Sequence, residues 1–253
     1  MNDYEELRSI ANEIAESVGT EVAERRSGGF VWSTKSSTSD VVTEIDTWAE
    51  DEIVRRITEK RPRDGLLGEE GTSTPGSTGV VWVIDPIDGT TNFLYDIPGY
   101  GISIGVQVDG AAVAGAVFDP VRLELFSAAL GQGAARNGQP ISPSPANELS
   151  TALVITGFSY QAEMRREQAR ILETVLPAVR DIRRLGGAAL DLCAIACGRA
   201  DASYERGLSP WDSIAGALIA REAGAIVDVG ELTWASAPGI ADAFQSLLER
   251  AQA

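Results

Sequence analysis

The sequence predicts a protein of mixed α and β structure, with an α+β first half followed by an α/β second half. Two helix-patterned segments precede a series of short apolar segments joined by tight turns, which indicates a mainly antiparallel sheet. After a polar, proline-containing segment at 140–150, strand and helix patterns alternate, as they do in α/β proteins. The length of 253 residues suits one large domain or two closely packed ones, and we expect a division into 1–145 and 146–253.

The first half opens with two predicted helices. Apolar residues recur at helical spacing over 4–23 and again over 45–57, with Asp46 near the start of the second helix. Between them, residues 28–42 are expected to form a strand and a polar loop. A short strand over 65–70 follows and ends in the sequence Gly-Glu-Glu.

The antiparallel sheet is predicted from the segments that come next. Residues 80–84 form an apolar run typical of a buried strand, and Pro86 is expected to end it because proline cannot donate to a strand ladder. Residues 102–108 and 111–118 flank an Asp-Gly turn and predict a hairpin. A further strand is expected over 123–128.

The second half is predicted to alternate strands and helices. We expect strands at 152–156, 182–185, 202–204 and 225–229. We expect helices at 162–178, 187–197, 211–223 and 239–251. Cys193 and Cys197 lie four residues apart in one of these helices, where buried reduced thiols are expected, since a zinc site would need more ligands.

The composition excludes several kinds of chemistry. The chain has no histidine, which rules out Ser-His-Asp and Cys-His catalysis and histidine-based metal sites. Its net charge of -16 disfavours binding to nucleic acid or to anionic membranes, and no apolar run is long enough to span a bilayer. The acidic, helix-patterned N-terminus is neither a signal peptide nor a transit peptide, so we expect a cytoplasmic protein. An enzyme of this composition must rely on carboxylates, hydroxyls, backbone amides and hard cations.

The motif IDPIDGTTNF, at 84–93, places two carboxylates at the end of an apolar strand. A turn after the strand would gather Asp85 and Asp88 round one point, where like charges are costly unless a cation shares them. Gly89 lets the backbone approach a ligand, and Thr90 can begin a helix whose free amides accept an anion. A cation site facing a phosphate cradle accounts for all of these features. The alternative is a solvated Asp-Pro turn followed by an aspartate that caps a helix.

Other acidic residues are weaker signals when each is taken alone. Glu69 and Glu70 end a short strand, and Asp212 lies at a predicted helix start, where aspartate is commonly a cap. The haloacid-dehalogenase-type phosphatases also carry aspartates after an apolar strand, in the pattern Asp-x-Asp-Gly-Thr. This chain has Asp-x-x-Asp-Gly-Thr instead, beginning only at Asp85, and that spacing argues against the same arrangement.

Taken together, the motifs are similar to those of a known family. IDPIDGTTNF, the preceding GEE and the later PWDSIAGALIAREAGA resemble the inositol monophosphatase family of magnesium-dependent phosphatases, and most closely its bacterial inositol-1-monophosphatase members. The resemblance covers nearly the whole chain and includes the segments 36–46, 103–106, 131–141 and 185–205. It implies a layered α-β-α-β-α sandwich, a homodimer and inhibition by lithium.

The resemblance also implies a hydrolytic site that holds two or three Mg²⁺ ions. The implied ligands are Glu69, Asp85, the Ile87 carbonyl, Asp88 and Asp212. One ion would hold the attacking water, which Thr90 and Glu69 would orient while Asp46 helps to polarise it through Thr90. A second ion would bind the phosphate and stabilise the leaving oxygen, and the amides of Gly89 and Thr90 would take a phosphate oxygen.

The second half is expected to select the alcohol. Glu205 matches a family glutamate that bonds ring hydroxyls, and the resemblance at this position favours inositol 1-phosphate over histidinol phosphate or a nucleotide 3'-phosphate. The alternative for Glu205 is a solvated loop acid. Asp88 and the amides of Gly187 and Ala188 are further implied substrate contacts, although Gly187 lacks the hydroxyl that the family often has there. Histidinol phosphate, fructose 1,6-bisphosphate and an adenosine 3'-phosphate are alternative substrates. A non-catalytic regulatory or binding protein on the same fold is an alternative of another class.

Overall fold

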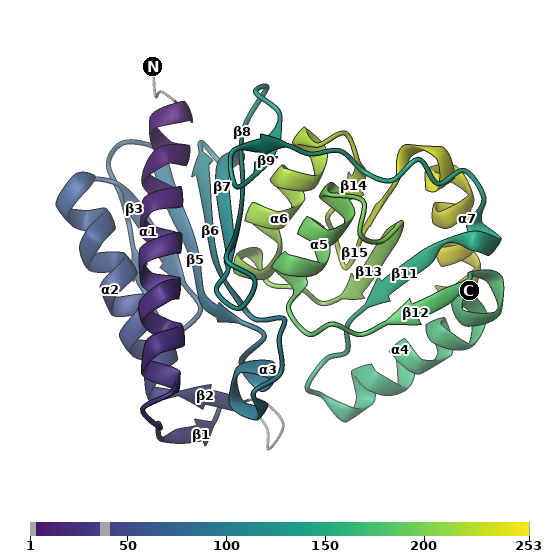
Figure 1. Cartoon of the computed structure of the whole chain (residues 1–253), viewed down its shortest axis with the longest axis horizontal. Coiled ribbons are helices and arrows are strands. Elements are labelled where there is room, and N and C mark those ends of the chain that lie inside the picture. Colours follow the sequence, from purple (N-terminus) through teal and green to yellow (C-terminus); the bar gives the residue numbers. More distant parts are fainter. Residues whose placement is uncertain (1–3, 36–40, 253) are drawn as a thin grey trace.

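The computed structural model describes residues 4–35 and 41–252. Figure 1 shows layers of helices alternating with the two sheets, so that helices cover both outer faces and also lie between the sheets. From one outer face to the other, the helices are α1 (Tyr4–Arg26) and α2 (Glu44–Lys60), α5 (Ala188–Ala196) and α6 (Pro210–Glu222), and α4 (Ala162–Val175) and α7 (Ala241–Gln252). The expected α-β-α-β-α sandwich is therefore confirmed.

The first sheet has eight strands in the order β10-β9-β8-β7-β6-β5-β3-β4. Its strands are β3 (Gly65–Gly68), β4 (Ser73–Thr74), β5 (Val80–Asp88), β6 (Gly101–Val108), β7 (Ala111–Asp119), β8 (Glu124–Ala129), β9 (Ala134–Arg136) and β10 (Gln139–Pro140). All neighbours pair antiparallel except β3 and β5, and the predicted hairpin is present as β6 and β7. A separate pair is formed by β1 (Trp32–Thr34) and β2 (Val41–Thr43), and the polar loop expected at 36–40 lies outside the described residues.

The second sheet has five strands in the order β12-β11-β13-β15-β14. They are β11 (Leu153–Thr156), β12 (Asp181–Arg183), β13 (Ala202–Arg206), β14 (Ile226–Asp228) and β15 (Leu232–Ser236). The sequence did not predict β15, because its five residues alternate too briefly to stand out after a polar turn. The helix predicted over 162–178 ends at Val175, since Pro177 lacks the N–H that would continue it, and a 3₁₀ turn follows.

A hydrophobic core joins the two halves of the chain. Val117 and Phe126 of the first sheet are buried in one cluster with Leu192 of α5 and Ile219 of α6. The expected division at 145/146 falls between the two sheets, and this core spans it. The two-domain description stays a prediction. The packing holds the first turns of α5 and α6 near the end of β5.

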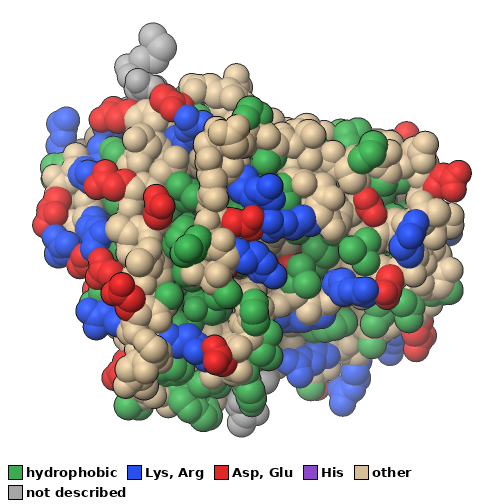
Figure 2. All heavy atoms as spheres, viewed as in Figure 1, with side chains coloured by type: hydrophobic (Ala, Val, Ile, Leu, Met, Phe, Trp, Pro, Cys, Tyr) green, Lys and Arg blue, Asp and Glu red, His purple; other side chains and the backbone are tan. Residues whose placement is uncertain are grey.

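Further features agree with the composition. The thiols of Cys193 and Cys197 are both free, as expected. Within the described ranges, no helix combines the length and apolar character needed to cross a membrane. Figure 2 shows acidic and basic side chains interspersed over the visible face, with a group of basic side chains near its middle. On that face, the excess of acidic residues is therefore not concentrated in a single patch.

Candidate metal and phosphate site

Asp85 and Asp88 lie at the end of β5, beside β6. Asp85 pairs with Ser103 and Asp88 with Gly101, so β5 takes three steps where β6 takes two. This bulge adds one residue to β5, and a one-residue shift turns the next side chain to the other face of a sheet. The two carboxylates therefore share a face. The expectation that Pro86 ends the strand is wrong, because Pro86 lies in the bulge, where its missing N–H costs no ladder hydrogen bond.

A third carboxylate comes from the second half of the chain. Asp212 lies in the first turn of α6, where the backbone N–H of Ser209 donates to its Oδ2 over 2.6 Å. One oxygen from each of Asp85, Asp88 and Asp212 lies within 4.8 Å of the others. Capping and metal ligation by Asp212 are compatible, because a carboxylate has two oxygens.

These three carboxylates are largely buried. Asp85 is 1% exposed and Asp88 7%, which rules out the alternative of a solvated Asp-Pro turn. Burial raises the pKa of all three above the usual range, that of Asp212 to about 7, and repulsion between neighbouring carboxylates adds to the shifts. Buried like charges this close are costly unless a cation neutralises them. A cluster of three oxygen donors fits a hard divalent cation such as Mg²⁺.

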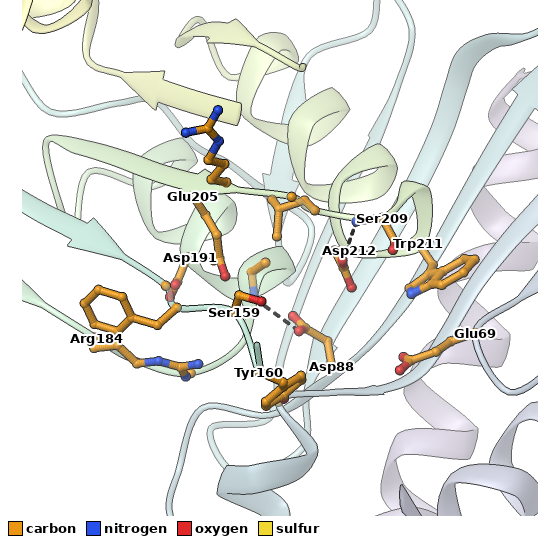
Figure 3. A pocket seen from close by; sticks show the side chains of 18 of the residues that line it. Glu69, Asp88, Ser159, Tyr160, Arg184, Asp191, Glu205, Ser209, Trp211 and Asp212 are labelled. Carbon is orange, nitrogen blue, oxygen red and sulfur yellow. Dashed lines mark hydrogen bonds between the residues drawn. The ribbon is translucent and has the colours of Figure 1, made fainter. Parts of the chain in front are cut away.

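Glu69 extends toward this cluster from the turn after β3 (Figure 3). After burial, its charge is the largest influence that raises the pKa of Asp85. The Nζ of Lys35 donates to Oε1 of Glu69 over 2.8 Å and to Oε1 of Glu70 over 2.6 Å. Lys35 thus neutralises part of the acidic group, a role that the sequence did not reveal, since its place before a polar loop gives no hint of this partner.

Thr90 and Asp46 are in contact, as the resemblance implies. The Oγ1 of Thr90 lies 3.3 Å from Oδ1 of Asp46 and 3.1 Å from the carbonyl oxygen of Ile87. Asp46 is fixed in the first turn of α2, where the N–H of Thr43 donates to its Oδ2 over 2.8 Å. Burial raises the pKa of Asp46 to about 6. A hydroxyl, a buried carboxylate and a backbone carbonyl are therefore held together beside the aspartate cluster.

Gly89 connects β5 to the short helix α3 (Thr90–Tyr95). Its φ of 88° lies in the left-handed region, which glycine adopts without steric cost. A Cβ at this position would also approach the carbonyl oxygen of Gly99 to 2.8 Å. Both features require glycine, and Gly89 borders the cavity described next. Phosphate binding by the amides of Gly89 and Thr90 stays a prediction.

A cavity of about 350 Å³ opens beside the cluster (Figure 3). Asp88, Asp212 and Glu69 line one end, and Glu205 of β13 lies at the other. Burial raises the pKa of Glu205 to about 7, which argues against a solvated loop acid. Further lining residues are Lys35, Ser159, Tyr160, Arg184, Asp191 and Trp211.

The start of α5 holds Asp88 in place. The N–H groups of Ala188 and Ala189 donate to the two oxygens of Asp88 over 3.1 and 2.8 Å. They are among the N–H groups that the first turn of a helix leaves without a partner. The amide of Ala188 is thus already engaged, and substrate contacts by Gly187 and Ala188 stay a prediction.

Arg184 and Asp191 were not among the predicted site residues. The charge of Arg184 lowers the pKa of both Asp191 and Glu205, so the guanidinium lies near the two carboxylates. A signal for Asp191 was available, because it is the single charged residue in the otherwise apolar segment 187–197. Arg184 carries no such signal, since an Arg-Arg pair is typical of an exposed loop.

Comparisons with known proteins cover the whole chain. A sequence model of a family described as "Inositol monophosphatase family" matches residues 3–250. The inositol-1-monophosphatase SuhB of Mycobacterium tuberculosis (strain ATCC 25618 / H37Rv) is 45% identical over 277 residues, which cover 98% of this chain and 95% of that protein. The solved structure of Mycobacterium tuberculosis SuhB has a TM-score of 0.87 at 43% identity and covers 99% of this chain and 98% of that chain.

A relative with a different name also matches. The Nus factor SuhB of Vibrio cholerae serotype O1 is 40% identical over 222 residues, which cover 87% of this chain and 80% of that protein. Proteins that carry two different functional names are thus similar to this chain in sequence over most of its length.

Proposed function

The chain belongs to the inositol monophosphatase family of phosphatases, and on that premise we propose that it hydrolyses inositol 1-phosphate, or a closely related small polyol phosphate, to the alcohol and inorganic phosphate. One observation carries the choice of substrate. The carboxylate cluster of Asp85, Asp88 and Asp212 borders a cavity whose other end presents Glu205. Such a site combines a cation and phosphate end with an end suited to hydroxyl groups.

The family is metal-dependent, and the metal we propose is Mg²⁺, with two or three ions per site. The residues that would hold it are Glu69, Asp85, Asp88, Asp212 and the carbonyl of Ile87. Only oxygen donors are available in this group, which favours Mg²⁺ over softer metals. When bound, the metal would neutralise charge on the phosphate and lower the pKa of the attacking water.

Side chains and backbone amides of the chain would orient the attacking water and bind the phosphate. When the Thr90 hydroxyl donates to Asp46, its oxygen is left to accept a hydrogen bond from the attacking water. Glu69 would accept a second hydrogen bond from the same water and so fix its orientation toward the phosphorus. The amides of Gly89 and Thr90 would bind a phosphate oxygen. This direct attack requires no covalent enzyme intermediate, in keeping with a chain that contains no histidine.

Further proposals concern assembly and partners. The family resemblance supports a homodimer and inhibition by millimolar Li⁺. The net charge of -16 supports the absence of nucleic-acid and membrane partners. A second candidate function is binding of a macromolecular partner, which the name of the Vibrio cholerae relative favours and which is compatible with catalysis.

Phosphate release from inositol 1-phosphate, with and without Mg²⁺, tests the proposed reaction. We expect release to require Mg²⁺ and to fall about a hundredfold or more in Asp88→Asn, because an amide cannot replace an anionic ligand. Asp242→Asn makes the same exchange at an exposed position of α7 and should keep full activity.

The possible results separate the alternatives. Mg²⁺-dependent release only from histidinol phosphate, fructose 1,6-bisphosphate or an adenosine 3'-phosphate would retain the chemistry and reject inositol 1-phosphate as the substrate. Absence of release from every ester would favour a non-catalytic binding protein on the same fold.

A further inference from the structure

Asp191 is a buried carboxylate of α5 at the wall of the cavity. The residue is 6% exposed, and its Oδ1 has no hydrogen-bond partner within the part of the chain that the structure describes. Buried polar atoms are nearly always hydrogen-bonded, so an unpaired carboxylate oxygen at a cavity wall indicates a partner that arrives with a ligand. Burial also raises the pKa of Asp191 well above its usual range, because few neighbouring groups stabilise the charged carboxylate.

Glu205 and Arg184 complete this end of the cavity. Figure 3 shows the Asp191 and Glu205 side chains close together in this view, with the Arg184 side chain below them. Arg184 lowers the pKa of both carboxylates, yet it forms no ion pair shorter than 4.0 Å with any residue in the described ranges. The carboxylates of Asp191 and Glu205 and the guanidinium of Arg184 thus line the same space without forming an ion pair with one another.

Gly157 leaves the space that one of these groups occupies. A Cβ at this glycine would lie 2.0 Å from Oε2 of Glu205, so the carboxylate occupies the space where a side chain would stand. Gly157 also lines the cavity. The absence of a side chain at Gly157 thus leaves room for Glu205 within the cavity, near Asp191.

We propose that Asp191 determines specificity by accepting a hydrogen bond from a substrate hydroxyl next to the one bound by Glu205, while Arg184 donates to a hydroxyl oxygen between them. This inference rests on the proposed phosphatase function. Hydroxyl groups fit the three residues because each can donate to a carboxylate and accept from a guanidinium.

The arrangement defines a class of substrate. It fits the phosphate ester of a neutral polyol that carries at least two adjacent hydroxyls. A second phosphate would face two carboxylates and only one guanidinium, so bisphosphates are disfavoured.

The test compares two esters in the Mg²⁺-loaded protein: inositol 1-phosphate, and 4-nitrophenyl phosphate, whose alcohol carries no further hydroxyl. Asp191→Leu should lower kcat/KM for inositol 1-phosphate about tenfold to a hundredfold, mainly through KM, because a hydrogen bond to a charged group is lost. It should change kcat/KM for 4-nitrophenyl phosphate by less than about twofold. Asp191→Asn has the same shape and keeps one acceptor oxygen, so it should lie between wild type and Asp191→Leu.

Cys193→Ala, a buried position of the same helix, controls for general loosening of α5 and should leave the ratio of the two activities unchanged. Equal losses on both esters, or no change on either, in both Asp191 variants would overturn the assignment. A wild-type preference for histidinol phosphate or fructose 1,6-bisphosphate over inositol 1-phosphate would overturn it as well. If wild type hydrolysed neither ester, the proposed function itself would be wrong, which is a distinguishable result.

Discussion

Thr90 is the residue on which the proposed orientation of water depends most directly. Its hydroxyl lies between Asp46 and the Ile87 carbonyl, and each contact needs the Oγ1 atom. Thr90→Ala should therefore lower kcat about 10²- to 10⁴-fold while KM changes little, the range expected when a positioned proton-transfer partner is lost. Steady-state kinetics on inositol 1-phosphate measure this effect.

Thr90→Ser is the matched control for that experiment. It keeps the hydroxyl and removes only the methyl group, so kcat should stay within about tenfold of wild type. If Thr90→Ser and Thr90→Ala lost activity equally, packing of the methyl group rather than the hydroxyl would be the important property of Thr90.

At the scale of elements, the turn that carries Glu69 is tied to α2 by Glu50. The N–H of Glu70 donates to Oε2 of Glu50 over 2.7 Å, and the N–H of Thr72 donates to its Oε1 over 2.9 Å. Glu50 is 3% exposed, and both hydrogen bonds are partly buried. One buried side chain of a helix thereby holds the backbone that presents a proposed metal ligand.

Glu50→Ala should both destabilise the protein and weaken its response to Mg²⁺. Losing two partly buried hydrogen bonds to a carboxylate costs on the order of 1–2 kcal/mol, which thermal unfolding would detect. The Mg²⁺ concentration for half-maximal activity should rise several-fold, because Glu69 is no longer held in place. Asp51→Ala, an exposed acid on the same helix, should do neither. An unchanged Mg²⁺ requirement in Glu50→Ala would show that the turn keeps its shape without Glu50.

The sequence predicted the parts of the site that depend on short motifs and missed those that depend on tertiary packing. The residues whose clustering it anticipated are Asp46, Glu69, Asp85, Asp88, Thr90 and Asp212. The bulge at Pro86 could not be predicted, because it is defined by the register against β6 and not by β5 alone. Asp191 could have been singled out as the one charged residue of the segment 187–197, whereas Arg184 was missed because only tertiary packing brings it to the cavity.

At the scale of the whole molecule, the buried carboxyl groups make stability depend on pH when metal is absent. Burial raises the pKa of Asp46 to about 6 and that of Glu205 to about 7. A raised carboxyl pKa means that the folded state binds the proton more tightly than the unfolded state. These groups therefore stabilise the fold fully below about pH 4, and their contribution is lost as pH rises through 6 to 7.

The Tm of the chelator-treated protein should accordingly fall between about pH 5 and pH 8. The glutamine in Glu205→Gln cannot ionise. This variant should therefore lose up to about 3 kcal/mol less of its free energy of unfolding than wild type over this pH range, and its Tm should fall less. Thermal unfolding across that pH range measures the difference. Glu173→Gln, an exposed position of α4, should retain the wild-type slope. Parallel Tm profiles for wild type and Glu205→Gln would contradict the expectation that burial of this carboxyl group costs stability.

The bulge in β5 has a consequence for inheritance. One extra residue decides that Asp88 faces the same side as Asp85. Deletion of the codon for Pro86 would remove the bulge and leave the two aspartates two residues apart, and residues two apart in a regular strand share a face. A lineage with that deletion would therefore keep both carboxylates on one side of the sheet. The longer spacing serves the site only together with the bulge, so a descendant gene that kept Asp-x-x-Asp but lost the bulge would turn its second aspartate away.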